Sequence, residues 1–181
     1  LADKAENKAR QRFAAIDAVS QQCTARVMAA FARHRVSDAC FGGTTGYGYD
    51  DVGRERLEAI YAAVFGCEKA LVRHSFVNGT HAIACAMFSA VKTGDTLLSI
   101  TGSVYDTLRT VAGVRGALGG TFADYGIGYR EVPLKNGMPD LPAIREAAAA
   151  SDVRAIFIQR SRGYGDRKSL TSAEIGELCA L

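Results

Sequence analysis

A short stretch of the chain, residues 76–84, places an amide, a glycine and a hydroxyl where a helix is predicted to begin. Asn78, Gly79 and Thr80 stand directly before an apolar helical run. The first N–H groups of a helix have no partners inside the helix, and the helix dipole favours an anion there. The three residues therefore predict a phosphate-binding helix start. An ordinary N-cap with a turn glycine is the commoner meaning of such a pattern, so spacing alone does not establish the phosphate site.

Polar side chains also follow two predicted strands, residues 96–100 and 154–159. In open parallel sheets, ligands bind beyond the carboxyl ends of the strands. We therefore expect the loops after these strands and the helix start at Gly79 to form one site. A tyrosine here is also compatible with the core, and an arginine with a solvated surface. The loops carry Ser103, Tyr105 and Asp106 after the first strand and Arg160, Ser161, Arg162 and Tyr164 after the second.

A glycine-rich segment, residues 41–49, lies nearer the N-terminus and contains Tyr47 and Tyr49. It contains neither G-x-x-x-x-G-K-[ST] nor a G-x-G-x-x-G placed between a strand and a helix. A flexible or tightly packed loop is therefore the first interpretation. Tyr47 and Tyr49 are unusual for a mere linker, because tyrosine offers a large contact area together with a hydroxyl.

The elements that would position these residues alternate regularly from Gly79 onward. We expect helices after Gly79, near residues 104–108, from residue 141 and from residue 172, a possible short helix after residues 119–120, and strands at 96–100, 129–132 and 154–159. This order predicts an α/β fold with a mostly parallel sheet and helices on both faces. Residues 70–73 are compatible with a short strand or an apolar turn.

The first thirty or so residues are predicted to form one long helix with an imperfect apolar stripe. Such a segment more often packs against another domain or subunit than forms a core of its own. A second helix is expected to be capped by Asp50 or Asp51 and to end at Gly66. We divide the chain into an N-terminal helical segment, residues 1–40, and an α/β domain, residues 41–181.

The composition argues against several classes of protein. A net charge of +3 is too small to indicate a nucleic-acid partner. No apolar run approaches the roughly 20 residues of a membrane span, and the opening residues lack a signal-peptide core. The 5 cysteines contain no C-x-x-C, so we expect reduced thiols in a cytoplasmic protein and no metal site.

Both ends of the chain are expected to be cut. The first residue is not Met, and a capping-box pattern at residues 171–174 starts a helix shortly before the chain stops at Leu181. A helix that short is marginal on its own. We therefore expect a piece of a longer protein.

Four motifs together resemble one family, and they occur in that family's order. They are residues 46–54, 77–82, 101–108 and 159–164. The family is the aluminium-resistance, methionine gamma-lyase-related branch of the fold-type I pyridoxal-phosphate (PLP) enzymes, which is cystathionine beta-lyase-like. The resemblance runs from about Phe41 to the end of the chain. It implies that residues 41–181 are an incomplete PLP-binding large domain, the N-terminal portion of the whole enzyme.

The resemblance assigns roles to the helix start and to the loop after residue 100. Asn78, Gly79 and Thr80 would hold the cofactor phosphate, and Tyr105 would stack on the pyridine ring. The family more often has serine where Asn78 stands. An amide can still cap the helix and donate a hydrogen bond.

Three further positions are assigned by the same resemblance. Tyr47 and Tyr49 would lie in a loop that enters the site of the neighbouring subunit. The arginine that the wider group carries in that loop has no clear counterpart here. Arg162 would contact the cofactor or the substrate.

The activity implied is that of a PLP-dependent carbon–sulfur lyase, which releases a thiol from a sulfur amino acid by beta- or gamma-elimination. This chemistry needs a Schiff-base lysine and a carboxylate facing the pyridine nitrogen. None of the lysines present lies in a matching motif, so we expect both groups beyond Leu181 and a fragment that is inactive alone. The working unit is expected to be a cytoplasmic homodimer or homotetramer, with an amino acid as its small-molecule substrate.

Two alternatives remain open at this stage. One is another fold-type I enzyme, an aminotransferase or a decarboxylase, since the residues that select the reaction are largely absent from this chain. The other is a non-catalytic α/β fragment, structural or regulatory, that binds a phosphate or nothing.

Overall fold

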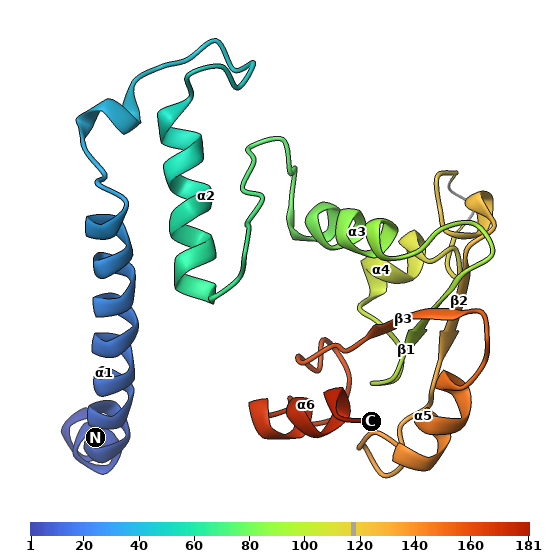
Figure 1. The fold of residues 1–181 in the computed structure, drawn as a ribbon. Helices are drawn as coiled ribbons and strands as arrows, with labels where there is room; N and C mark the ends of the chain where they lie inside the picture. The colour runs from blue at the N-terminus through green and yellow to red at the C-terminus, as the bar shows by residue number, and fades with distance from the viewer. Residues whose placement is uncertain (117–118) are drawn as a thin grey trace. The chain divides into compact units, whose positions relative to one another are not determined.

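The structure is a computed structural model that describes residues 1–116 and 119–181 (Figure 1). In these ranges the chain forms six α-helices, two 3-10 helices and three β-strands. They group into two compact units, Leu1–Ser75 and Phe76–Leu181. Residues 41–75 therefore group with the N-terminal helix, whereas the sequence placed a boundary at residue 40. No helix in the described ranges combines the length and the apolar character needed to cross a membrane.

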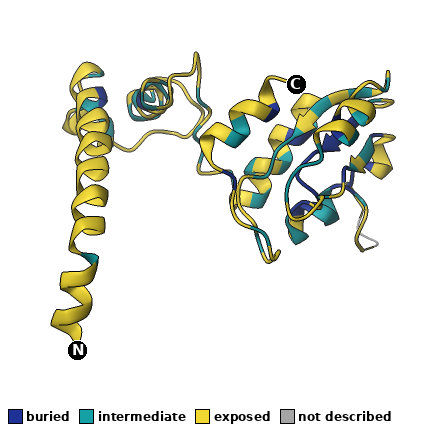
Figure 2. Cartoon of the chain, turned by 90° about the horizontal axis from the view of Figure 1, so that it is seen from below, coloured by how far each residue is buried: buried dark blue, intermediate teal, exposed yellow. Residues whose placement is uncertain are grey.

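The first unit contains the long helix α1 (Ala2–Arg33), the 3-10 helix η1 (Asp38–Phe41) and helix α2 (Val52–Phe65). Both predicted α-helices are confirmed. Figure 2 shows that α1 is exposed along most of its length, and Ala30 is its one buried residue. An exposed 32-residue helix is in keeping with the imperfect apolar stripe in its sequence.

Helix α2 begins and ends as its terminal residues dictate. The Asp51 side chain accepts a hydrogen bond from the Arg54 N–H at 3.0 Å, so Asp51, and not Asp50, is the cap. Gly66 ends the helix in the left-handed region, with φ of 68°. Residues 70–73 form no strand; the Val72 N–H donates to Glu58 Oε1 on α2 at 2.9 Å. The strand alternative for this segment was wrong.

The second unit is built on a parallel sheet of three strands: β1 (Thr96–Ser99), β2 (Gly128–Glu131) and β3 (Val153–Phe157). The strand order is β2-β1-β3, so β1 is central and pairs with a strand on each side. Leu97 lies opposite Tyr129 on β2 and Ala155 on β3. The three predicted strands are confirmed within one or two residues at their ends.

Helices cover both faces of this sheet, as predicted. Leu97 packs with Met87 of α3 and Leu108 of α4 in one core, whereas its neighbour Leu98 packs with Ile144 of α5 in the other. Successive side chains of a strand point to opposite faces, so β1 presents an apolar side chain to the helices on each face of the sheet. The four flanking helices are α3 (Gly79–Ala90), α4 (Asp106–Val111), α5 (Leu141–Ala148) and α6 (Ser172–Cys179).

Two shorter predictions also concern this unit. The short helix expected after the glycines at 119–120 is the 3-10 helix η2 (Ala123–Tyr125), which follows the fully buried Phe122. The capping box at the start of α6 is present. Thr171 Oγ1 accepts from the Glu174 N–H at 3.2 Å, and Glu174 Oε2 accepts from the Thr171 N–H at 2.7 Å.

Alanine substitutions at two helical glycines test the packing, and we expect them to change the stability in opposite directions. A Cβ built on Gly53 in α2 would lie 2.1 Å from the Cys40 carbonyl oxygen, whereas one on Gly176 in α6 meets nothing within 4 Å. We expect Gly53→Ala to destabilise the complete protein by about 1–3 kcal/mol through overpacking. Gly176→Ala should stabilise it by roughly 0.5–1 kcal/mol through helix propensity. Urea unfolding measures both, and a gain in stability for Gly53→Ala would contradict the close approach.

Candidate active site

The helix start singled out in the sequence forms as a capped N-terminus of α3. Asn78 is extended, with φ of −162°, and its Oδ1 accepts from the His81 N–H at 2.9 Å. The first intrahelical bond runs from the Ala82 N–H to the Asn78 carbonyl at 3.1 Å. The N–H groups of Gly79 and Thr80 precede that bond and are available to an anion. A Cβ built on Gly79 meets no atom within 4 Å, so the space in front of this turn is open.

A second hydroxyl lies beside Thr80. The Oγ1 atoms of Thr80 and Thr107 are 2.9 Å apart and share a hydrogen bond between the starts of α3 and α4. Both residues line a hollow of about 410 Å³, together with Thr110 and Thr121. Hydroxyls beside free helix N–H groups are suitable donors for a phosphate, so these residues fit the phosphate of PLP. Thr107 was not recognised from the sequence as a site residue, although it lies within one of the four motifs.

Tyr105 stands just before α4, and its ring lies against Tyr164. The two ring centroids are 5.4 Å apart with 27° between the planes, and the Tyr105 hydroxyl donates to the Tyr164 hydroxyl at 3.1 Å. Tyr105 and the exposed Arg162 line one pocket of about 460 Å³. One face of the Tyr105 ring is therefore taken by a tyrosine. A stacked pyridine ring would use the other face or displace Tyr164.

The start of α4 lines both hollows. Tyr105 faces one and Thr107 the other, and Asp106 stands between them in the chain. The structure thus brings the expected phosphate residues and the expected ring residue into the same part of the second unit. The loops after β1 and β3 lead into this region, as parallel strand polarity requires.

The charged side chain of Arg109 also lines the Tyr105 pocket. It forms an ion pair with Glu131 Oε1 at 3.3 Å and contacts Ser103 Oγ. Glu131 also accepts a hydrogen bond from the Tyr129 hydroxyl at 2.8 Å. Burial, and then this hydrogen bond, raise the pKa of Tyr129 well above its usual range. Tyr129 consequently stays a neutral donor to Glu131 even at alkaline pH.

Gln159 and Arg167 are further residues that the sequence did not single out. Gln159 Oε1 accepts from the Tyr105 N–H at 2.8 Å, and Arg167 donates to the carbonyls of Gln159 and Ser161 at 2.8 and 2.9 Å. Gln159 belongs to one of the four motifs, and this was the sequence feature that could have identified it as a site residue. Its partner is 54 residues away along the chain, so spacing could not identify the contact.

Tyr47 and Tyr49 lie in the first unit, in the glycine-rich loop. Their side chains are 84% and 81% exposed. The loop is nevertheless tied to α2, because Arg54 pairs with Asp51 at 3.2 Å and donates to the Gly46 carbonyl at 3.3 Å. Two exposed tyrosines on a tethered loop are available for contact with another chain. Their predicted place in a neighbouring subunit's site stays a prediction.

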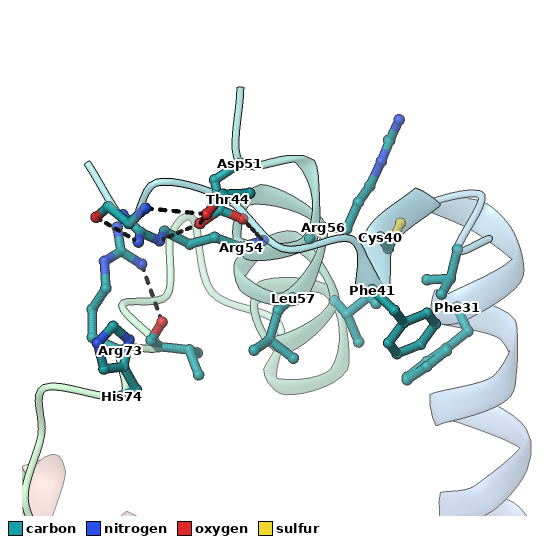
Figure 3. A pocket seen from close by; sticks show the side chains of 15 residues that line it. Phe31, Cys40, Phe41, Thr44, Asp51, Arg54, Arg56, Leu57, Arg73 and His74 are labelled. Atoms are coloured by element: carbon teal, nitrogen blue, oxygen red, sulfur yellow. Dashed lines mark hydrogen bonds and ion pairs between the residues drawn. The ribbon is translucent and has the colours of Figure 1, made fainter. Parts of the chain in front are cut away.

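The first unit also contains a pocket of about 550 Å³ beside this loop (Figure 3). Phe31, Phe41 and Leu57 supply an apolar part of its lining, and Arg54 and Arg73 lie along its polar side (Figure 3). Both arginines are paired with carboxylates, Arg54 with Asp51 and Arg73 with Glu58. Their charge is therefore largely balanced within the unit. In the described ranges, no group of three or more His, Cys, Asp or Glu side chains could hold a metal ion.

Comparison with known proteins gives consistent matches over the whole chain. The family model for methionine gamma-lyase matches residues 1–181. The uncharacterized protein YnbB of Bacillus subtilis (strain 168) is 47% identical over 165 residues, which are 90% of this chain and 39% of that protein.

Solved structures of relatives also match nearly the whole chain. One is described as a carbon-sulfur lyase involved in aluminum resistance from Clostridium novyi NT, with a TM-score of 0.90 and 37% identity over 97% of this chain and 42% of that one. Another, from Listeria innocua, is assigned provisionally as a cystathionine beta-lyase involved in aluminum resistance; its TM-score is 0.94, with 42% identity over 98% of this chain and 44% of that one. The chain spans less than half the length of each of these relatives.

The contact between Tyr105 and Tyr164 predicts a measurable pKa shift. The hydrogen bond that Tyr105 donates to Tyr164, and then burial, raise the pKa of Tyr105. Tyr164→Phe keeps the stacked ring but removes the acceptor, so the pKa of Tyr105 should fall. The stability that this bond contributes is present at neutral pH and is lost as the pH rises through the raised pKa. NMR titration of ring-labelled tyrosine measures the shift. Tyr125→Phe, at an exposed position on η2, is the control and should leave the pKa of Tyr105 unchanged.

Proposed function

The chain belongs to the methionine gamma-lyase family, and we propose that it is the N-terminal part of a PLP-dependent carbon–sulfur lyase. The names of the solved relatives, carbon-sulfur lyase and cystathionine beta-lyase, support a lyase. The observation that most supports PLP as the cofactor is the capped start of α3, with two free N–H groups and the Thr80–Thr107 hydroxyl pair beside it. We propose that the second unit, together with the segment 41–75 that precedes it, forms an incomplete large domain of fold type I over residues 41–181.

The residues of this chain would bind and orient the cofactor. Gly79 and Thr80 would donate their N–H groups to the phosphate, and the hydroxyls of Thr80 and Thr107 would donate from the side. The ring of Tyr105 would pack against the pyridine face and exclude water from it. Arg162, exposed in the same pocket, would contact an anionic group of the cofactor or the substrate.

When bound, PLP would act as an electron sink for negative charge at the alpha carbon of a sulfur amino acid, so that a thiol can leave. The Schiff-base lysine that would move the alpha proton and the carboxylate that would face the pyridine nitrogen are expected in the part of the protein after Leu181. We propose that this chain alone is inactive for that reason. A cytoplasmic homodimer or homotetramer, with Tyr47 and Tyr49 reaching a neighbouring subunit's site, belongs to the same proposal.

The reaction is tested with the complete protein and added PLP. Methionine, cystathionine and cysteine should each be assayed for keto acid, ammonia and thiol, and at least one should release all three. Treatment with borohydride should abolish the visible absorption band and label a lysine after residue 181. Keto acid formed without ammonia would instead indicate an aminotransferase, and the absence of a band would leave a non-catalytic protein.

The phosphate site is tested by Asn78→Asp. Aspartate caps a helix as well as asparagine does, so the melting temperature should remain unchanged. Its negative charge would oppose the phosphate and raise the dissociation constant of PLP about tenfold, or about 1.4 kcal/mol, the order of a like-charge contact near the surface. Pyridoxal, which lacks the phosphate, is the control ligand and should bind the variant and the wild type equally. An equal loss for both ligands would place the phosphate elsewhere.

A further inference from the structure

Gln159 lies two residues after the end of β3, at the carboxyl end of the sheet. Its backbone is held from two directions. The Gln159 N–H donates to Thr101 Oγ1, in the loop after β1, at 2.9 Å. Its carbonyl accepts from the Arg167 guanidinium at 2.8 Å. The side chain of Gln159 therefore starts from a fixed point between the loops that follow β1 and β3.

The side-chain amide of Gln159 also has a partner at each end. Oε1 accepts from the Tyr105 N–H at 2.8 Å, and Nε2 donates to the Ser161 carbonyl at 3.1 Å. An N–H group can only donate and a carbonyl can only accept, so the partners determine which end of the amide faces which. A glutamate here would keep the acceptor and lose the donor. A methionine of similar length would lose both.

The backbone of Tyr105 depends on this amide. Tyr105 is the N-cap residue of α4, and its own side chain makes no capping hydrogen bond. Its carbonyl is engaged by the N–H groups of Leu108 and Arg109 at 2.9 and 3.1 Å. Its N–H precedes the helix, where no intrahelical acceptor exists, and Gln159 supplies the acceptor.

The same loop also touches the ring of Tyr105. Gly163 has φ of 57°, and a Cβ built on it would lie 3.2 Å from Tyr105 Cδ2, so a glycine allows this close approach. Tyr164, the next residue, stacks on the ring. The loop after β3 thus sets the Tyr105 backbone through Gln159 and bounds the ring through Gly163 and Tyr164.

We propose that Gln159 is a positioning residue for Tyr105: its amide fixes the backbone from which the Tyr105 ring enters the pocket shared with Arg162. The relevance of that ring to the cofactor rests on the proposed function. Gln159 acts through Tyr105, so its effect should disappear when the Tyr105 ring is absent. An amide suits this role because one side chain accepts from the Tyr105 N–H and donates to the Ser161 carbonyl.

The first test needs no cofactor. In the complete protein, hydrogen exchange of the Tyr105 amide should be at least tenfold faster in Gln159→Met than in the wild type. Gln159→Glu retains the acceptor and should restore most of the protection. Gln22→Met, at an exposed position on α1, is the matched control and should change nothing. Unchanged Tyr105 exchange in Gln159→Met would overturn the proposal.

The second test uses ligand affinity. Gln159→Met should raise the dissociation constants of PLP and pyridoxal about tenfold and leave that of inorganic phosphate unchanged, because the α3 start is untouched. In a Tyr105→Ala background, Gln159→Met should have no further effect, which a double-mutant cycle detects. Additive losses would mean that Gln159 does not act through Tyr105 and would overturn the proposal. If the wild-type protein binds no PLP, the proposed function fails, and the exchange experiment still decides the role of Gln159.

Discussion

The second unit depends on the pairing of β1 with a parallel strand on each side. All four residues of β1 are buried, and Leu97 and Leu98 pack into two separate cores. Parallel pairing requires each connection to cross back over the sheet, and the crossover segments supply the helices that bury those side chains. One buried strand thereby creates the need for helices on both faces of the sheet.

Strand polarity then decides where polar side chains meet. Because β1 and β3 run in the same direction, the loops that follow them leave the sheet at the same edge. Ser99, at the end of β1, is fully buried, and its Oγ donates to the Gly102 carbonyl at 2.7 Å to turn the chain. Tyr105, Thr107 and Gln159 are brought together in this way. The candidate site is a consequence of the sheet and needs no separate scaffold.

Hydrogen bonds between residues far apart in the chain hold the site together. Thr101 and Gln159 join the loops after β1 and β3, and Thr80 and Thr107 join the starts of α3 and α4. Such contacts hold a rigid frame for a ligand, because each donor and acceptor has a defined partner. The first unit is a separate compact body, in which Arg54 tethers the loop that displays Tyr47 and Tyr49.

The sequence by itself determined the features that depend on neighbouring residues. The cap at Asn78 and the capping box of Thr171 and Glu174 are local, since backbone geometry brings residues three or four apart into contact. Only the tertiary structure decided which distant groups meet. It paired Gln159 with Tyr105 across 54 residues, stacked Tyr164 on Tyr105 and excluded a strand at residues 70–73. Those contacts depend on how the chain crosses over the sheet, and the spacing of neighbouring residues does not predict that path.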